Sequence, residues 1–183
     1  RSCLVGSEMC IRDSIYQIYE KDNIGVKKSN INGWHSKSFD LTDKDNIPNR
    51  FLNHINDHIK DVFQNYGWVF DASKIKCTSF WAIINKKGNF NIEHTHSNNY
   101  LSAAYYVKAP QNCGKFKASN PNIISRNIYP KSIQSTELNS NTASIEIKDG
   151  DLIVFPAYLP HSVEENKSNE DRVIVSFNLD ILR

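Results

Sequence analysis

The sequence predicts a mainly β protein, in which short strands form an antiparallel sandwich or barrel behind one helix. Two observations carry this prediction. From residue 76 onward, short segments rich in β-branched and aromatic residues alternate in polarity, which is typical of strands. Turns rich in Gly, Asn and Pro separate these segments, and no insert with a helical pattern joins them, which favours antiparallel over parallel pairing.

The predicted elements begin with the helix. Between Pro48 and Gln64 apolar residues recur at helical spacing, and proline is favoured in the first turn of a helix. An amphipathic helix is therefore expected there. Four strands are expected after it, at 76–85, 101–108, 151–155 and 172–179.

Residues 15–183 are expected to form a single domain. A chain of 183 residues, of which 39% are hydrophobic, can bury one core of ordinary size but is short for two. Residues 1–14 have no clear period and look like translated adapter read-through, so we expect a non-native or unstructured leader there. The segment 112–144 is rich in Asn, Ser and Pro, and we expect it to cover the substrate or to form surface loops.

The charge pattern disfavours some classes of partner. The net charge is +2 and the Lys and Arg residues are dispersed, so neither nucleic acid nor a membrane surface is expected as a partner. A small-molecule or peptide substrate fits better, and a homo-oligomer is left open. No apolar stretch has the length of a transmembrane helix or a secretory signal, so a cytoplasmic location is expected. The four cysteines are irregularly spaced, which indicates ordinary reduced thiols.

Three histidines, His94, His96 and His161, are the most informative residues of the chain. His94 and His96 lie at i and i+2, so on a strand their side chains point to the same face. His161 follows the apolar run 152–155, far along the chain. We expect the three imidazoles to converge on one metal ion. Imidazole binds Fe, Zn, Cu and Ni, so the histidines alone do not identify the metal.

Arg172 is the candidate partner for a second ligand. The polar segment 164–171 separates it from His161, so we expect a β-hairpin in which the two residues lie close to opposite each other. With a small register offset, the guanidinium would lie roughly 7–8 Å from the histidine, the diagonal cross-strand separation. That gap suits a short dicarboxylate that chelates a metal at one end and meets the arginine at the other.

Together these residues resemble the Fe(II)- and 2-oxoglutarate-dependent oxygenases, and more narrowly the group known from marine bacteria and phages. The likeness spans most of 32–182. It is carried by Gly33-Trp34-His35-Ser36, Trp81 with Asn85, GNFNIEHTH at 88–96, LSAAYY at 101–106, GDLIVFPAYLPH at 150–161 and RVIVSFNL at 172–179. The resemblance implies a double-stranded β-helix, a jelly-roll or cupin-like fold, with one or two flanking helices. It also implies His94 and His161 as metal ligands and Arg172 as the anchor of the far carboxylate of 2-oxoglutarate.

His96 departs from the pattern of that family, in which a carboxylate takes this ligand position. A neutral imidazole leaves a ferrous site one charge more positive, which alters affinity and redox behaviour without preventing chelation. Glu93 is adjacent, but strand alternation points it to the opposite face. On inward strand faces, Asn85, Tyr106 and Ser176 are further candidates for binding the co-substrate.

The resemblance implies a dioxygenase that uses Fe(II) and 2-oxoglutarate to hydroxylate an unknown substrate, with succinate and CO2 as co-products. No catalytic residue is expected beyond the metal centre. The same histidines would also suit a cupin dioxygenase that does not use 2-oxoglutarate, or a zinc enzyme that activates water. A ligand-binding jelly roll without enzymatic activity is the remaining alternative.

Overall fold

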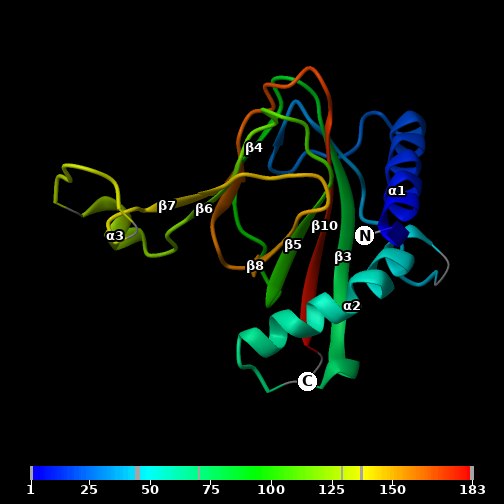
Figure 1. Ribbon diagram of the computed structural model, residues 1–183, viewed down its shortest axis with the longest axis horizontal. Helices are drawn as coiled ribbons and strands as arrows, with labels where there is room; N and C mark the ends of the chain where they lie inside the picture. Colours follow the sequence, from blue (N-terminus) through cyan, green and yellow to red (C-terminus); the bar gives the residue numbers. More distant parts are fainter. Residues whose placement is uncertain (1, 44–45, 70, 129, 137, 182–183) are drawn as a thin grey trace.

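Two five-stranded antiparallel sheets, packed face to face, form the body of the protein (Figure 1). The computed structural model describes residues 2–43, 46–69, 71–128, 130–136 and 138–181. The minor sheet contains, in order, β1 (Asn30–Ile31), β4 (Phe90–His94), β9 (His161–Val163), β6 (Phe116–Ser119) and β7 (Thr142–Ile145). The major sheet contains, in order, β2 (Trp34–His35), β3 (Ile75–Asn85), β10 (Arg172–Ile181), β5 (Leu101–Lys108) and β8 (Leu152–Pro156). The mainly β, antiparallel prediction and its four strands are confirmed.

The predicted amphipathic helix is α2 (Ile47–Asn65), which begins and ends within one residue of the expected bounds. Asn46 caps it, because its side-chain oxygen accepts a hydrogen bond from the backbone N–H of Asn49 at 3.2 Å. Pro48 lies in the first turn, where a backbone N–H has no acceptor within the helix, so the N–H that proline lacks is not needed. A single 3-10 turn, η1 (Ala72–Lys74), leads into β3.

A second helix, α1 (Ser2–Lys21), was not expected from the sequence. Ile15 is fully buried, and Ile11 and Ile18 pack against the same core, so a narrow apolar stripe holds the helix to the body. Residues 2–14, where a leader is expected, form the first part of this helix, and the division of the chain at residue 14 stays a prediction. Within the described parts of the chain, none of the helices combines the length and apolar character that a bilayer span requires.

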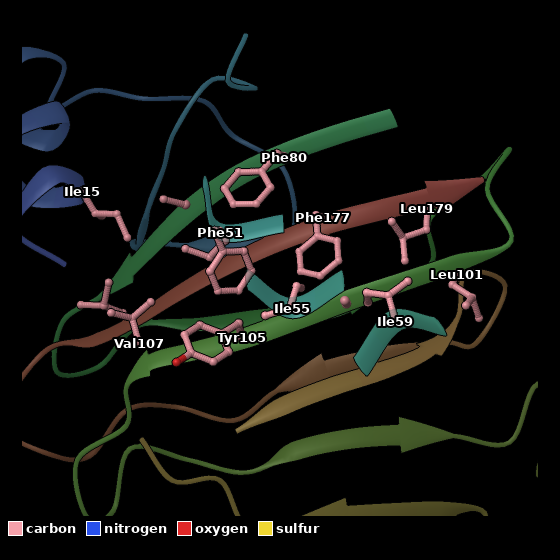
Figure 2. Packing of buried hydrophobic residues seen from close by; sticks show 14 of the residues in the cluster. Ile15, Phe51, Ile55, Ile59, Phe80, Leu101, Tyr105, Val107, Phe177 and Leu179 are labelled. Carbon is pink, nitrogen blue, oxygen red and sulfur yellow. The ribbon is translucent and has the colours of Figure 1, made fainter. Parts of the chain in front are cut away.

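The main core lies between α2 and the major sheet. Phe51, Ile55 and Ile59 recur every four residues along α2 and face the sheet. They meet the alternate residues of the central strands, as Figure 2 shows for Phe80, Tyr105, Phe177 and Leu179. Because alternate residues of a strand point to opposite faces, the remaining residues of the same strands face the minor sheet. The helix thus covers the outer face of the major sheet, and its inner face is available for a site.

The hairpin predicted between His161 and Arg172 is wrong. His161 begins β9, which pairs with β4 and β6 in the minor sheet. Arg172 begins β10, which pairs with β3 and β5 in the major sheet. The connection between them therefore crosses from one sheet to the other, which is the reason that His161 and Arg172 approach the interior from opposite walls.

A projection leaves the minor sheet where β6 ends and β7 begins, and it contains the short helix α3 (Ile123–Asn127) (Figure 1). Arg126 of α3 forms an ion pair with Glu93 of β4 at 3.0 Å, which ties the base of the projection to the sheet. Beyond that point the projection extends away from the sandwich. This arrangement favours surface loops over a substrate cover for the segment 112–144.

The Phe177→Ala variant is expected to lose about 3–5 kcal/mol of unfolding free energy, because it leaves a cavity at a fully buried ring between α2 and the major sheet. Chemical denaturation followed by circular dichroism measures the loss. The matched control is Ile133→Ala, whose side chain is exposed, and this variant is expected to unfold like the wild type. Equal stability of both variants would contradict the assigned core.

Candidate metal centre

Antiparallel pairing of β4 with β9 brings the distant histidines together. His94, the last residue of β4, is the register partner of His161, the first residue of β9. The backbone N–H of His96 donates to the carbonyl of Ala157 at 2.8 Å, which holds the segment after β4 against the turn before β9. The expected convergence of the three histidines is therefore present in the fold.

The three imidazoles form a compact cluster. His94, His96 and His161 each offer one ring nitrogen, and these atoms all lie within 4.8 Å of one another. The centroids of the His94 and His161 rings are 4.2 Å apart, and the ring of His96 lies 5.0 Å from the first and 5.1 Å from the second. Among the described residues, no other group of histidine, cysteine or carboxylate side chains has this property. In particular, His54 and His58 of α2 are exposed on its outer face.

Backbone carbonyls set the tautomers of two of the rings. Nδ1 of His94 lies 2.8 Å from the carbonyl oxygen of Ile92, and Nδ1 of His161 lies 2.9 Å from that of Leu159. A carbonyl oxygen can only accept, so Nδ1 carries the proton in both rings and Nε2 keeps a free lone pair. An outer hydrogen bond of this kind is the usual support of a metal-binding histidine.

The cluster is uncharged at neutral pH. Burial lowers the pKa of His96 to about 3 and that of His161 to about 4, and it also lowers the pKa of His94. Three neutral rings whose nitrogens lie this close together can bind a cation, whereas three protonated rings would repel it and one another.

No carboxylate of the described residues joins the cluster. Glu93 lies on the other face of β4, as strand alternation predicts, where it accepts hydrogen bonds from Ser119 and Arg126. The hydrogen bond from Ser119, with Arg126 beside it, holds the pKa of Glu93 below its usual range. Its carboxylate is thus fully engaged outside the cluster.

The cluster lies on the wall of a cavity of about 740 Å³ between the two sheets. Tyr106 and Ser176 of the major sheet line it, as expected from the alternation of β5 and β10. Its aromatic wall contains Trp81, Phe116 and Phe155. A cavity of this size accommodates a small organic molecule.

Arg172 and Asn85 lie behind the cavity and do not line it. The two residues are register partners in β10 and β3, and both are fully buried. Nη1 of Arg172 donates to the backbone carbonyls of Cys113 and Glu164, but Nε and Nη2 have no partner among the described residues. Burial lowers the pKa of Arg172, and the nearby hydroxyl of Tyr106 also lacks a partner. Beyond Tyr106, the interior therefore holds several polar atoms that no described protein group satisfies.

His35 is a cavity residue to which no role was assigned from the sequence. It lies in β2, is buried, and its ring stacks on that of Trp81 with centroids 5.8 Å apart. Its Nδ1 lies 2.6 Å from the carbonyl oxygen of Ser36. The two-residue strand β2 has too little alternation for a sequence pattern to reveal which way His35 points.

Comparison with known proteins is consistent with this geometry. A family model described as "Putative 2OG-Fe(II) oxygenase" matches residues 79–178, which is more than half of the chain. That range includes His94, His96, His161 and Arg172. No curated protein matches the sequence significantly.

Several solved structures share the fold at low sequence identity. A prolyl-4-hydroxylase of Pseudomonas putida aligns with a TM-score of 0.60 at 12% identity, over 96% of this chain and 88% of the other. HygX of Streptomyces hygroscopicus, solved with nickel and 2-oxoglutarate, aligns with a TM-score of 0.64 at 10% identity, over 96% and 78%. A Trichoplax adhaerens prolyl hydroxylase, solved with a peptide fragment of the hypoxia inducible factor, aligns with a TM-score of 0.62 at 12% identity, over 96% and 79%.

These structures support the double-stranded β-helix that the resemblance implies. The family match and the histidine cluster identify an oxidoreductase that uses Fe(II) and 2-oxoglutarate. The chain belongs to the 2OG-Fe(II) oxygenase family.

Proposed function

We propose that the protein is a dioxygenase that binds Fe(II) through His94, His96 and His161 and hydroxylates a carbon–hydrogen bond of an organic substrate. The single observation that carries this proposal is the imidazole cluster on the cavity wall, with its three ligand atoms within 4.8 Å of one another. Two of the neutral rings have fixed tautomers, and the third, that of His96, has no hydrogen-bond partner among the described residues. This set of rings fits the donor set of a divalent transition metal.

Replacement of a carboxylate by His96 is proposed to change the charge of the site rather than its capacity to chelate. A site with three imidazoles keeps the full charge of the metal, so it attracts anionic ligands more strongly than a site with one carboxylate does. A dicarboxylate co-substrate supplies negative charge of its own. We therefore infer that the negative charge of bound 2-oxoglutarate offsets the additional positive charge of the all-histidine site.

Arg172 is proposed as the anchor of the far carboxylate of 2-oxoglutarate. It is a fully buried cation with two unpartnered guanidinium nitrogens and no carboxylate beside it among the described residues. A buried charge without a counter-charge is unfavourable, so an anionic ligand would stabilise it. Tyr106 is proposed to donate its unpartnered hydroxyl to the same carboxylate. Asn85 and Ser176, which share the inner face of the major sheet, are proposed to contact the co-substrate from the side.

When bound, Fe(II) and 2-oxoglutarate supply the oxidising chemistry, in which 2-oxoglutarate is decarboxylated to succinate and CO2 while O2 provides one oxygen atom to the substrate. The chain itself binds both groups, orients the substrate and excludes water. Trp81, Phe116 and Phe155 give the cavity an apolar wall, which supports the exclusion of water from the reacting groups.

The substrate is proposed to be a small molecule or a peptide. The prolyl hydroxylase of Trichoplax adhaerens, which shares the fold, was solved with a peptide fragment. The volume of the cavity supports a substrate, or a substrate segment, of modest size. The cytoplasmic location and the oligomeric state stay predictions.

One second candidate is favoured by the donor set itself. Three imidazoles with an open fourth position are also an arrangement for catalytic zinc, which activates water without 2-oxoglutarate. Metal analysis of the purified protein distinguishes the two, because iron with 2-oxoglutarate dependence supports the dioxygenase and zinc without it supports the hydrolytic enzyme.

Arg172→Ala is expected to lower succinate formation from 2-oxoglutarate and Fe(II) at least about tenfold, because it removes the cation that meets the far carboxylate. Succinate is measured with and without a panel of candidate substrates. Arg172→Lys keeps the charge but loses the planar guanidinium, so it should retain part of the activity. This variant therefore distinguishes loss of the anchoring charge from misfolding. Arg50→Ala, which removes an exposed cation of α2, is the matched control and should be unaffected. Unchanged turnover in Arg172→Ala, verified as folded by circular dichroism, would refute the assignment.

His96→Leu is expected to weaken Fe(II) binding at least about a hundredfold, because it removes one of three ligands. His96→Asp should preserve binding, since a carboxylate is an alternative ligand at this position. The measurement is an anaerobic Fe(II) and 2-oxoglutarate titration followed by visible absorption. The control is His58→Leu, an exposed histidine of α2, which should titrate like the wild type. Tight binding by His96→Leu would exclude His96 from the ligand set.

A further inference from the structure

We propose that the prime substrate carries a free carboxylate next to an amide N–H, as an acylated amino acid or a peptide C-terminus does, and that Lys28 receives the carboxylate. This inference rests on the proposed function, because it takes the histidine cluster to be the reacting end of the same cavity. It concerns a group of four cavity residues that the mechanism above does not use. This group, the Lys28 subsite, contains Lys28, Ser29, His35 and Asn91.

The cavity is positively charged at one side. Among the described residues that line it there is no Asp or Glu, and the two lysines are Lys28 and Lys37. Lys37 already has a partner, since its ammonium group lies 3.5 Å from the carboxylate of Asp22. No described carboxylate forms an ion pair with Lys28. Lys28 is therefore the cationic side chain of the cavity lining that is free to meet an anion.

The backbone places Lys28 on the same side of the cavity as the reacting end. The backbone N–H of Val26 donates to the carbonyl of His35 at 2.8 Å, and the backbone N–H of Ile92 donates to the carbonyl of Ser29 at 2.9 Å, so Lys28 lies between β2 and β4, the strand that ends at His94. The His35 ring stacks on Trp81, and the Trp81 ring in turn lies 5.5 Å from that of His96. An aromatic wall thus runs from Lys28 to the histidine cluster, and it suits a molecule with an apolar middle and a charged end.

Asn91 contributes a hydrogen-bonding group that no atom of the described residues satisfies. Its Nδ2 donates to the Ser29 hydroxyl at 3.2 Å, whereas its Oδ1 is buried without a partner among the described residues. Buried polar atoms are normally paired, so a ligand that brings a donor completes this amide. An N–H beside the carboxylate supplies such a donor near Lys28.

The subsite fits a monoanion better than a phosphate. It has one free ammonium group and no arginine, whereas a dianionic phosphate is usually held by several donors or by a bidentate guanidinium. The substrate class is therefore a monocarboxylate.

The test compares matched acids and amides by binding rather than by turnover. The probes are N-acetylphenylalanine and N-acetylleucine, their primary amides, and their N-methylated acids. Dissociation constants are measured by saturation-transfer NMR on the full chain, loaded with Zn(II) and saturated with 2-oxoglutarate. The acids should bind roughly tenfold more tightly than the amides. The N-methylated acids should bind several-fold more weakly than the unmethylated acids.

Three variants assign the effect to its residues. Lys28→Gln should abolish the preference for acids, and Lys28→Arg should retain it. Lys27→Gln is the matched control, because it removes the same charge one residue away at a side chain that does not line this cavity. Asn91→Leu should abolish the effect of N-methylation.

Several results would overturn the inference. These are equal binding of acids and amides, no binding by any acid, an acid preference that survives Lys28→Gln, or no effect of N-methylation. Weaker 2-oxoglutarate binding in Lys28→Gln would overturn it as well, since Lys28 would then serve the co-substrate. Because no turnover is measured, each of these failures leaves the Fe(II) and succinate tests of the proposed function untouched.

Discussion

The antiparallel pairing of β4 with β9 is the interaction on which the site depends. It sets His94 opposite His161 in register, and the hydrogen bond from the His96 backbone to Ala157 extends the same contact by two residues. A slip of one residue in either strand would turn a histidine to the outer face, because side chains alternate along a strand. The outer face is already occupied at this point by the ion pair between Glu93 and Arg126. The correct register therefore places the neutral histidines inside and the ion pair of Glu93 and Arg126 outside. The reverse arrangement would bury the charged groups.

The major sheet supports the site because each of its central strands is buried on both faces. In β10, Val173, Val175 and Phe177 pack toward α2, while Ile174 and Ser176 face the cavity. The outer contacts give the strands their stability, so the inner positions can carry polar residues whose burial is unfavourable on its own. Arg172 and Asn85 show this division most clearly. Both are fully buried with unpartnered polar atoms, and both are attached to strands whose outer face belongs to the main core.

The elements with a clear period could be predicted from the sequence, and the elements without one could not. β3, β5, β8, β10 and α2 are long enough for alternation or helical spacing to be visible, and all five were expected. The strands β1, β2 and β9 have two or three residues each, too few to show a period, and α1 presents only a narrow apolar stripe. The histidine spacing predicted the cluster from the shared face of residues i and i+2 on a strand. β4 ends at His94, but the backbone hydrogen bond from His96 to Ala157 continues the contact with the segment before β9. The strand pairing of Arg172 with His161 was predicted incorrectly. Their proximity in the sequence suggested a hairpin, whereas the chain crosses from one sheet to the other between them.

The charges of the interior suggest why the proposed metal ligands contain no carboxylate. Among the described residues that line the cavity there is no Asp or Glu. The titratable groups of the lining are Tyr106, four histidines with lowered pKa values, Lys28 and Lys37, and the buried Arg172 lies behind them. With a divalent cation added, such an interior has an excess of positive charge, which destabilises it unless anions enter. A carboxylate ligand would offset part of this excess permanently. With histidine in its place, the offset must come from bound ligands, so that the affinity of the cavity for anions is greatest when the metal is present. In the proposed site, the histidine that makes the metal site more positive therefore couples metal binding to the binding of a dicarboxylate, and the two ligands are expected to stabilise the protein together more than either does alone.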